Sequence, residues 1–248
     1  MSLSFTKQKF LRLCKKEQHK KCAQLMREIY LTYLEKKPIE TLVDIYQELI
    51  NWMGLHNPLK ISLQTFSNLY HIHLEKASLS LKEHNFLPDI RRWDKTPQKE
   101  FGHCHLYLDN LRSAYNVGNI LRTVEALRLG PVYFGGNTPT TENPKVRKTS
   151  MGSWELVSCI KSGDILHLPK PLIILETIDK TAAVSHFAYP QVFTLVLGNE
   201  EYGVSDAILR EGDLFIQIPL FGKKNSLNAA SAFAICAHYI RTYWDNHA

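Results

Sequence analysis

A turn bracketed by two glycines follows an apolar run in the second half of the sequence. Residues 198–203 read G-N-E-E-Y-G, directly after V-F-T-L-V-L at 192–197. Glycines at such a place let a backbone come close to a ligand, as in phosphate-binding loops. No lysine follows Gly203 as a P-loop requires, and the glycine spacing does not give the G-x-G-x-x-G of a dinucleotide site. These features disfavour a triphosphate or a dinucleotide, while a plain strand-to-helix loop stays open.

Two further stretches show the same density of glycine, small and polar residues. One contains N-V-G-N-I-L-R at 116–122, and the other begins I-P-L-F-G-K-K-N-S-L-N at 218–228. Together with L-G-N-E-E-Y-G at 197–203, they closely resemble the three motifs of the SpoU/TrmH family of RNA ribose 2′-O-methyltransferases, in the same order. One motif would be weak evidence, but three in order over about 120 residues are strong.

The resemblance covers roughly residues 104–244. It implies a fold of the SPOUT superfamily, with a C-terminal trefoil knot, a homodimer formed through the knotted domain, and S-adenosylmethionine as the methyl donor. Composition and periodicity cannot show a knot, because threaded chains are rare. The donor is expected to rest mainly on backbone groups, and the implied cofactor-binding residues are Leu197, Gly198, Asn199, Gly203, Ile218, Leu227 and Asn228.

A ribose hydroxyl reacts only when its proton leaves or its developing charge is stabilised. The resemblance makes Arg122 a catalytic residue, and on a helix it lies about 200° from Ile120, away from the apolar face. Because arginine scarcely ever releases its proton, we favour a clamp on the RNA phosphate that also stabilises the alkoxide, rather than a general base. The other residues implied at the reaction site are Asn116, Glu200, Ser226 and Asn228.

Positive charge is concentrated near the N-terminus. The net charge is +6, and the segment 7–21 holds seven basic residues and one acid, whereas residues 101–248 contain equal numbers of each. Such a segment fits a polyanion, although a solvated helix face is an equally good explanation. A loop at 137–154 combines basic residues with Trp154, the types used for phosphate contact and base stacking. The predicted RNA-binding residues are Lys7, Arg12, Lys15, Lys16, Lys20, Lys145, Arg147 and Lys148.

The elements that must position these residues differ between the two halves of the chain. Apolar residues at three- and four-residue steps predict helices at 20–34, 39–52 and 63–82. Later, short apolar runs alternate with helical stretches, which predicts a mostly parallel sheet with helices on both faces. The expected strands are 105–108, 131–134, 172–175, 192–197 and 214–218, and the expected helices are 119–129, ended by Gly130, and 227–244.

We therefore expect an all-helical region at 1–98, for RNA binding or an accessory role, followed by a knotted α/β methyltransferase domain at 99–248. There is no apolar run of membrane-spanning length, no signal peptide and no C-x-x-C pair, which points to a cytoplasmic protein with reduced thiols. The run His103-Cys104-His105 lacks a partner pair, so no metal is expected, and neither are DNA or membrane partners.

Several alternatives remain open at the level of sequence. The RNA substrate is either a tRNA or a ribosomal RNA, because the resemblance does not reach the first hundred residues. A base methyltransferase of a related knotted family would leave the ribose untouched. A non-catalytic RNA-binding protein on the same fold is expected to lose Arg122, Glu200 or Asn228, and all three are present.

Overall fold

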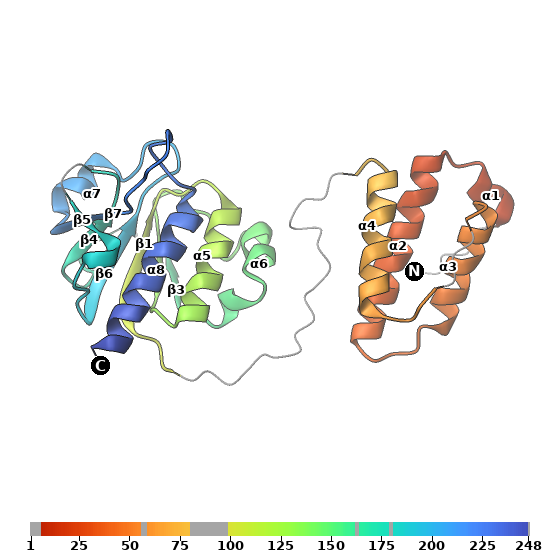
Figure 1. The fold of residues 1–248 in the computed structure, drawn as a ribbon, viewed down its shortest axis with the longest axis horizontal. Helices are drawn as coiled ribbons and strands as arrows, with labels where there is room; N and C mark the ends of the chain where they lie inside the picture. The colour runs from red at the N-terminus through yellow and green to blue at the C-terminus, as the bar shows by residue number, and fades with distance from the viewer. Residues whose placement is uncertain (1–5, 56–58, 80–98, 162–163, 179–180, 248) are drawn as a thin grey trace. The chain divides into compact units, whose positions relative to one another are not determined.

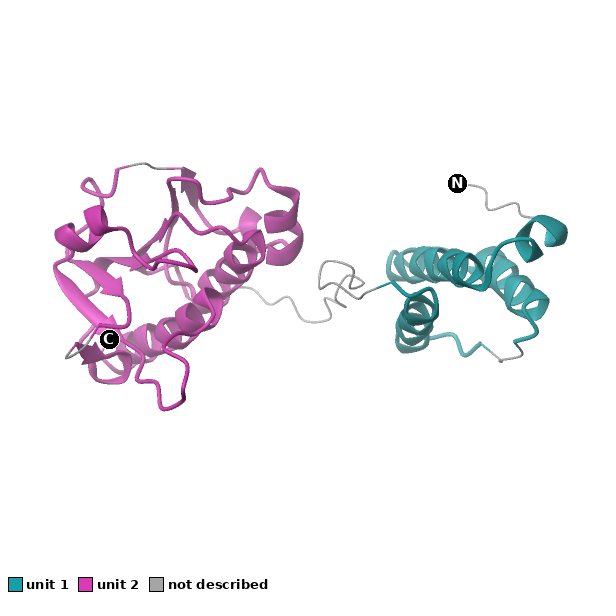
Figure 2. Cartoon of the chain, turned by 90° about the horizontal axis from the view of Figure 1, so that it is seen from above, with its two compact units in different colours: residues 1–94 teal, residues 95–248 magenta. Residues whose placement is uncertain are grey.

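The computed structural model describes residues 6–55, 59–79, 99–161, 164–178 and 181–247. The chain divides into two compact units, residues 1–94 and residues 95–248, which are coloured separately in Figure 2. Each has its own hydrophobic core, so we describe each by itself. We call them the helical unit and the α/β unit.

The helical unit is built from amphipathic helices whose apolar faces meet (Figure 1). Large side chains such as Phe10, Met26 and Phe66 are completely buried there. The last helix starts where Ser62 Oγ accepts a hydrogen bond from the Thr65 backbone N–H at 3.1 Å, a standard N-cap. The helices are α1 (Lys7–Leu11), α2 (Lys15–Leu34), α3 (Glu40–Trp52) and α4 (Leu63–Lys76).

A polar cluster lies inside this apolar core. The Nδ1 atoms of His19 and His73 are 2.8 Å apart, and the Tyr46 hydroxyl lies 2.9 Å from Nε2 of His73. Two ring nitrogens can share a hydrogen only if at least one ring is neutral. Burial, followed by the neighbouring His19 and Lys76, lowers the pKa of His73 to about 4. Burial, Lys76 and Lys15 also lower the pKa of His19. The cluster is therefore stable in its neutral form.

In the described part of the α/β unit, seven strands form one sheet in the order β3-β2-β1-β6-β4-β7-β5. Every neighbouring pair runs parallel, which confirms the predicted mostly parallel sheet. The strands are β1 (His103–Asp109), β2 (Val132–Gly135), β3 (Cys159–Lys161), β4 (Leu172–Leu175), β5 (Ala182–Ala183), β6 (Val192–Leu197) and β7 (Leu214–Gln217).

Both faces of the sheet are covered. On one face, α5 (Ala114–Leu127) and α8 (Ala229–Asn246) pack over alternate strand residues such as Leu106 and Leu195. On the other face, Tyr107 and Val196 pack against Ile208 of α7 (Asp206–Glu211) and against the segment around Ile165. Because helices cover both faces, the carboxyl ends of the strands lie between two helical layers. Parallel sheets of this kind bind their ligands at that edge.

Several predicted helix boundaries were wrong. Helix α5 begins at Ala114, not at 119, because Ser113 Oγ accepts a hydrogen bond from the Asn116 N–H. It ends at Leu127, and its left-handed cap residue is Arg128, not Gly130. Arg128 tolerates a φ of 49° there because Nε donates to the Lys99 carbonyl and the guanidinium lies over the Phe101 ring. The final helix begins at Ala229 rather than at 227.

The segment 137–154 is not only a loop. It contains α6 (Pro144–Ser150), which Asn143 caps by accepting a hydrogen bond from the Lys145 N–H. The third helix predicted in the first half, 63–82, ends at Lys76, and residues 80–82 lie outside the described ranges. None of the helices described is long and apolar enough to cross a bilayer.

Acidification should loosen the helical unit. The pKa of His73 is about 4 in the folded protein and 6.5 in the unfolded chain. Between pH 4 and pH 6.5, the unfolded chain therefore binds more protons than the folded protein. The stability that the neutral ring contributes is present above about pH 6.5 and is lost toward pH 4, on the order of 3 kcal/mol. We expect hydrogen-exchange protection of α2 and α4 peptides to fall from about pH 7.5 to about pH 5, after correction for intrinsic rates.

The exposed His167 provides the control, because its side chain is 85% accessible in the α/β unit. His167→Gln should leave this pH dependence of α2 and α4 unchanged, whereas His73→Gln should flatten it. Equal protection of the wild-type helices at both pH values would contradict a neutral buried pair.

Candidate active site

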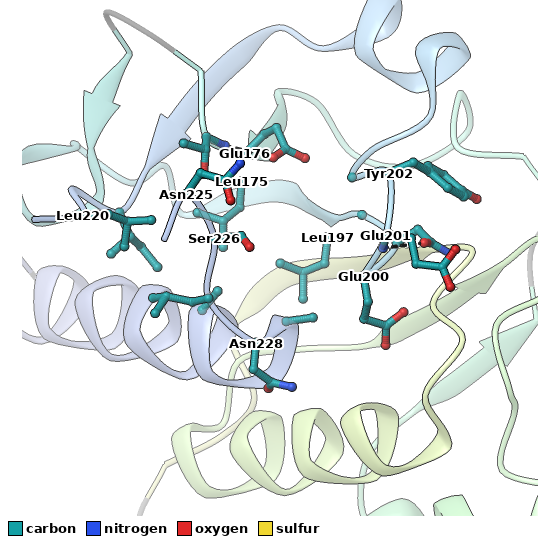
Figure 3. A pocket seen from close by; sticks show the side chains of 18 residues that line it. Leu175, Glu176, Leu197, Glu200, Glu201, Tyr202, Leu220, Asn225, Ser226 and Asn228 are labelled. Carbon is teal, nitrogen blue, oxygen red and sulfur yellow. Dashed lines mark hydrogen bonds between the residues drawn. The ribbon is translucent and has the colours of Figure 1, made fainter. Parts of the chain in front are cut away.

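A pocket of about 580 Å³ opens at the carboxyl ends of β4, β6 and β7, beside the N-terminus of α8 (Figure 3). It is formed by three segments that are far apart in the sequence, namely the residues directly after β4, the turn after β6 and the segment that leads from β7 into α8. Its lining residues are Leu175, Glu176, Thr177, Leu197, Gly198, Asn199, Glu200, Glu201, Tyr202, Gly203, Ile218, Leu220, Asn225, Ser226, Leu227, Asn228, Ala229 and Ala232.

The glycine turn after β6 closes on itself. The Asn199 N–H donates to the Gly203 carbonyl at 2.8 Å, and the Gly203 N–H donates back at 2.9 Å. A Cβ atom on Gly198 would lie 2.2 Å from the Gly203 carbonyl carbon. Gly203 itself has a φ of +77°, and a Cβ there would lie 2.5 Å from the Glu176 carboxylate. The folding of the turn therefore explains both glycines, and the closed turn presents Glu200 and Tyr202 at its tip.

Glu200 ties this turn to the start of α5. Its carboxylate accepts hydrogen bonds from the backbone N–H groups of Arg112 at 2.8 Å and Ser113 at 3.1 Å. It also accepts one from Asn116 Nδ2 at 2.8 Å. Burial acts to raise the pKa of Glu200, but these hydrogen bonds to the charged form outweigh it and hold the pKa below its ordinary value. Glu200 is thus ionised and serves as an acceptor.

The same network continues into the third motif. Asn116 Oδ1 accepts a hydrogen bond from Asn228 Nδ2 at 3.0 Å. Asn228 Oδ1 in turn caps α8 by accepting from the N–H groups of Ala230 and Ser231. One side-chain relay, Glu200–Asn116–Asn228, therefore joins all three motifs and fixes the pocket to the N-termini of two helices.

The pocket carries negative charge only. Glu176, Glu200 and Glu201 line it, and no lysine, arginine or histidine is among the described lining residues. Glu201 pairs with Arg112 at 2.6 Å on the exposed rim. Glu176 accepts from the backbone N–H groups of Thr177 and Val204, and it has no cationic partner among the residues that the structure describes. Such a pocket attracts a cation and repels a phosphate, which independently disfavours nucleotide phosphates as ligands.

Most of the residues predicted for the site meet at this pocket. Glu200, Ser226 and Asn228 line it, and Asn116 adjoins it through the relay. The predicted cofactor-binding residues all line it too, although the Asn199 side chain is engaged within the turn and with the Asn110 carbonyl. The seven are Leu197, Gly198, Asn199, Gly203, Ile218, Leu227 and Asn228.

Arg122 lies apart from them. It is exposed on α5, does not line the pocket, and makes no hydrogen bond or ion pair within the described ranges of the chain. It lies six positions after Asn116, so the two side chains point about 120° apart around the helix. Within one copy of the chain, Arg122 is thus free to contact another molecule.

The predicted RNA-binding residues occupy two separate places. Lys7, Arg12, Lys15, Lys16 and Lys20 lie on or beside α1 and the first turns of α2, where Lys20 pairs with Glu17 at 3.3 Å. Lys145, Arg147 and Lys148 lie on α6, all exposed. Arg147 is partly used for structure, since Nε donates to the Thr141 carbonyl and the guanidinium lies 4.7 Å from the Trp154 ring centre.

Sequence reasoning missed two acidic residues that organise the site. Asp109 is buried at the end of β1 and accepts from the Ser205 N–H at 2.7 Å, which anchors the start of α7. Glu176 follows β4 directly and supports the glycine turn. An acidic residue immediately after a buried parallel strand was a usable signal for both, since such strand ends face the binding edge of the sheet.

Comparison with known proteins agrees with this geometry. The model of the SpoU rRNA methylase family matches residues 103–238. The 23S rRNA (guanosine(2553)-2′-O)-methyltransferase RlmP of Bacillus subtilis is 27% identical over 164 residues, covering 59% of this chain and 66% of that protein. The uncharacterized tRNA/rRNA methyltransferase MG252 of Mycoplasma genitalium is 31% identical over 137 residues, covering 52% of this chain and 56% of that protein.

Among solved structures, the SpoU methyltransferase AviRb from Streptomyces viridochromogenes, in complex with the cofactor AdoMet, superposes with a TM-score of 0.53. It is 23% identical and covers 60% of each chain, which establishes a shared fold. This chain spans less than two thirds of the length of these relatives, so their activities do not transfer to it by similarity alone.

Replacing Glu200 by glutamine should weaken the α/β unit, because an amide N–H₂ would then face the donors that now meet a carboxylate. We expect a loss of about 1–2 kcal/mol, discounted for the solvent exposure of Glu200. The adjacent Glu201→Gln, which breaks only an exposed ion pair, should cost less than about 1 kcal/mol. Scanning calorimetry of the melting transition measures both, and equal shifts for the two variants would show that Glu200 does not hold the loops together.

Proposed function

This chain belongs to the SpoU rRNA methylase family, and we propose that it transfers a methyl group from S-adenosylmethionine to a ribose 2′-hydroxyl of a structured RNA. The observation that carries the proposal is the Glu200–Asn116–Asn228 relay. It joins three separate motifs beside one pocket whose charged lining residues are all acidic. Named relatives act on ribosomal RNA or on tRNA/rRNA, and both classes of RNA are candidate substrates here.

The pocket suits this methyl donor. S-adenosylmethionine carries one net positive charge and supplies an electrophilic methyl group on its sulfonium sulfur. The carboxylates of Glu176 and Glu200 favour such a charge, and Leu197, Ile218 and Leu227 provide apolar walls for the nucleoside. Backbone groups of the turn after β6 and of the segment before α8 would hold the polar edges of the ligand.

Activation of the ribose hydroxyl falls to the polar residues around the relay. Ser226 lines the pocket, and Asn116 and Asn228 are held in fixed orientations by their mutual hydrogen bond. Arg122 remains permanently charged, so it would clamp an RNA phosphate and stabilise the alkoxide, while the hydroxyl proton passes to solvent water and the methyl group moves from the sulfonium sulfur to the oxygen.

A homodimer through the α/β unit belongs to the same proposal. Arg122 does not line the pocket of its own chain, so a second copy offers a way for it to reach a reaction site. Helix α8 also presents Ile235 and Tyr239, both more than a third exposed and one turn apart. The trefoil knot is part of the proposal through family membership, with the pocket loops after β6 and β7 as the segments that hold the donor.

The helical unit would capture RNA. We assign residues 1–98 to this role and residues 99–248 to catalysis. The exposed lysines and arginine of α1 and early α2 support it, because phosphate contacts supply most of the sequence-independent affinity for RNA. Lys145 and Lys148 on α6 would add contacts close to the reaction.

Radiolabelled S-adenosylmethionine, incubated separately with unmodified tRNA and unmodified ribosomal RNA, tests the reaction. We expect label in an alkali-resistant dinucleotide after digestion, because a methylated ribose blocks cleavage at that position. Arg122→Lys should lower turnover by roughly 10-fold or more, since lysine cannot form the bidentate contact. Label on a base would identify the related base methyltransferases instead, and cofactor binding without transfer to either RNA would favour a non-catalytic RNA-binding protein.

The negative charge of the pocket leads to a second prediction, which compares the binding of the methyl donor with that of its demethylated product. The demethylated product, S-adenosylhomocysteine, has lost the sulfonium charge and is neutral overall. Glu176→Gln should therefore weaken binding of the donor roughly 3- to 10-fold while changing binding of the product little. Isothermal titration calorimetry with each ligand gives the two Kd values.

Glu201→Gln is the matched control, because Arg112 already neutralises that carboxylate. It should leave the ratio of the two Kd values close to that of the wild type. If Glu176→Gln weakened both ligands equally, the carboxylate would act through the shape of the turn and not through its charge.

A further inference from the structure

One aromatic side chain of the α/β unit is almost entirely exposed to solvent. Phe221 is 98% exposed, whereas the next most exposed large apolar residue in the described chain, Leu156, is 61% exposed. It belongs to the segment Ile218–Asn228, which joins β7 to α8 without regular structure and which we call the arm. All residues from Phe221 to Asn228 are exposed. A phenyl ring in this position contributes nothing to the core, so its presence needs another explanation.

The chemistry next to this ring is cationic. Lys223 and Lys224 follow it, both exposed, and neither makes an ion pair within the described ranges of the chain. Gly222 separates them from the ring, and a Cβ atom added to it would meet no other atom within 4 Å, so the tip of the arm is open on that side. An aromatic ring beside two unpaired ammonium groups is the combination that binds nucleic-acid bases and phosphates.

The arm is fixed at the pocket by both of its ends. Leu220, just before the ring, and Asn225 and Ser226, just after the lysines, all line the pocket (Figure 3). The positive charges of the arm therefore lie next to a pocket whose charged lining residues are all acidic. A nucleotide bound on the arm would be held close to the pocket, and its phosphates would be kept out of it.

We propose that the arm binds a single-stranded nucleotide of the RNA, with the Phe221 ring stacked on a base and Lys223 and Lys224 on neighbouring phosphates. The inference rests on the proposed function, since it presumes that RNA is the substrate. A contact with a second copy of the chain is less suited to the arm. In a two-fold symmetric dimer centred on it, the unpaired lysines of both copies would face each other.

The test is binding of a single-stranded RNA of roughly 12 nucleotides that contains 2-aminopurine, compared with a duplex of the same sequence. Phe221→Ala should weaken binding of the single strand roughly 5- to 100-fold and abolish the change in 2-aminopurine fluorescence that stacking causes. Duplex binding should change little. Leu166→Ala, which removes another exposed apolar side chain of the same unit, is the matched control and should behave as the wild type.

The lysines have a separate readout. The double variant Lys223→Gln, Lys224→Gln should reduce the slope of log Kd against log salt concentration by roughly 1.4, about 0.7 for each lost phosphate contact with a single strand. An unchanged slope would overturn the assignment of these lysines to phosphates.

Binding is measured without turnover, so the two proposals can fail independently. If wild-type protein methylates RNA but Phe221→Ala binds the single strand as tightly as the wild type, the arm proposal is wrong and the function stands. If Phe221→Ala loses single-strand binding but the wild-type protein methylates no RNA, the arm proposal stands and the proposed function is wrong. Should sedimentation show that Phe221→Ala dissociates a dimer with RNA affinity unchanged, the arm is a contact between copies and the proposal is overturned.

Discussion

The α/β unit depends on one ionised carboxylate. Glu200 stands at the tip of a turn after β6, yet it accepts hydrogen bonds from the first residues before α5 and from Asn116 inside that helix. Because Asn116 also accepts from Asn228, the start of α8 is held to the same point. Loops are normally the most variable part of a parallel sheet, and here charge-assisted hydrogen bonds give three of them one fixed geometry. The pocket exists because these three loops cannot move independently.

This arrangement explains why the motif residues have the types they do. Asparagine can donate and accept at once, which a relay between two other side chains requires. The glycines of the turn are needed because its backbone folds against itself and against Glu176, so their relation to a ligand is indirect. Most of the motif therefore builds the walls of the site, and only a few of its atoms remain free for a ligand.

Much of the fold and of the candidate site was predictable from the sequence, and the predictions that were wrong failed for physical reasons. Buried parallel strands are continuous apolar runs, so 172–175 and 192–197 were located to the residue. Strands β3 and β5 are short edge strands with little apolar signal and were missed. The end of α5 was misplaced because Arg128, held over Phe101, takes the left-handed cap position that sequence assigns to glycine. The spacing of Asn116 and Arg122 on a helix shows that they face different directions, but no local pattern could show which of them adjoins a pocket built by distant loops.

The distribution of charge constrains how an RNA could reach this site. A pocket lined by three carboxylates repels phosphodiesters, so the only part of a nucleotide that can approach without an electrostatic cost is a neutral group such as a ribose hydroxyl. The phosphates must then be bound outside the pocket, and the exposed cations of this unit, Arg122 on α5, Lys148 on α6 and Lys224 on the arm, all lie outside it. The cations outside the pocket would attract the RNA phosphates, and the carboxylates within it would repel them. Together these forces would turn the sugar toward the bound methyl donor. Under the proposed function, the site thus selects a hydroxyl over its neighbouring phosphates because the described cations lie outside the pocket and the charged residues within it are acidic.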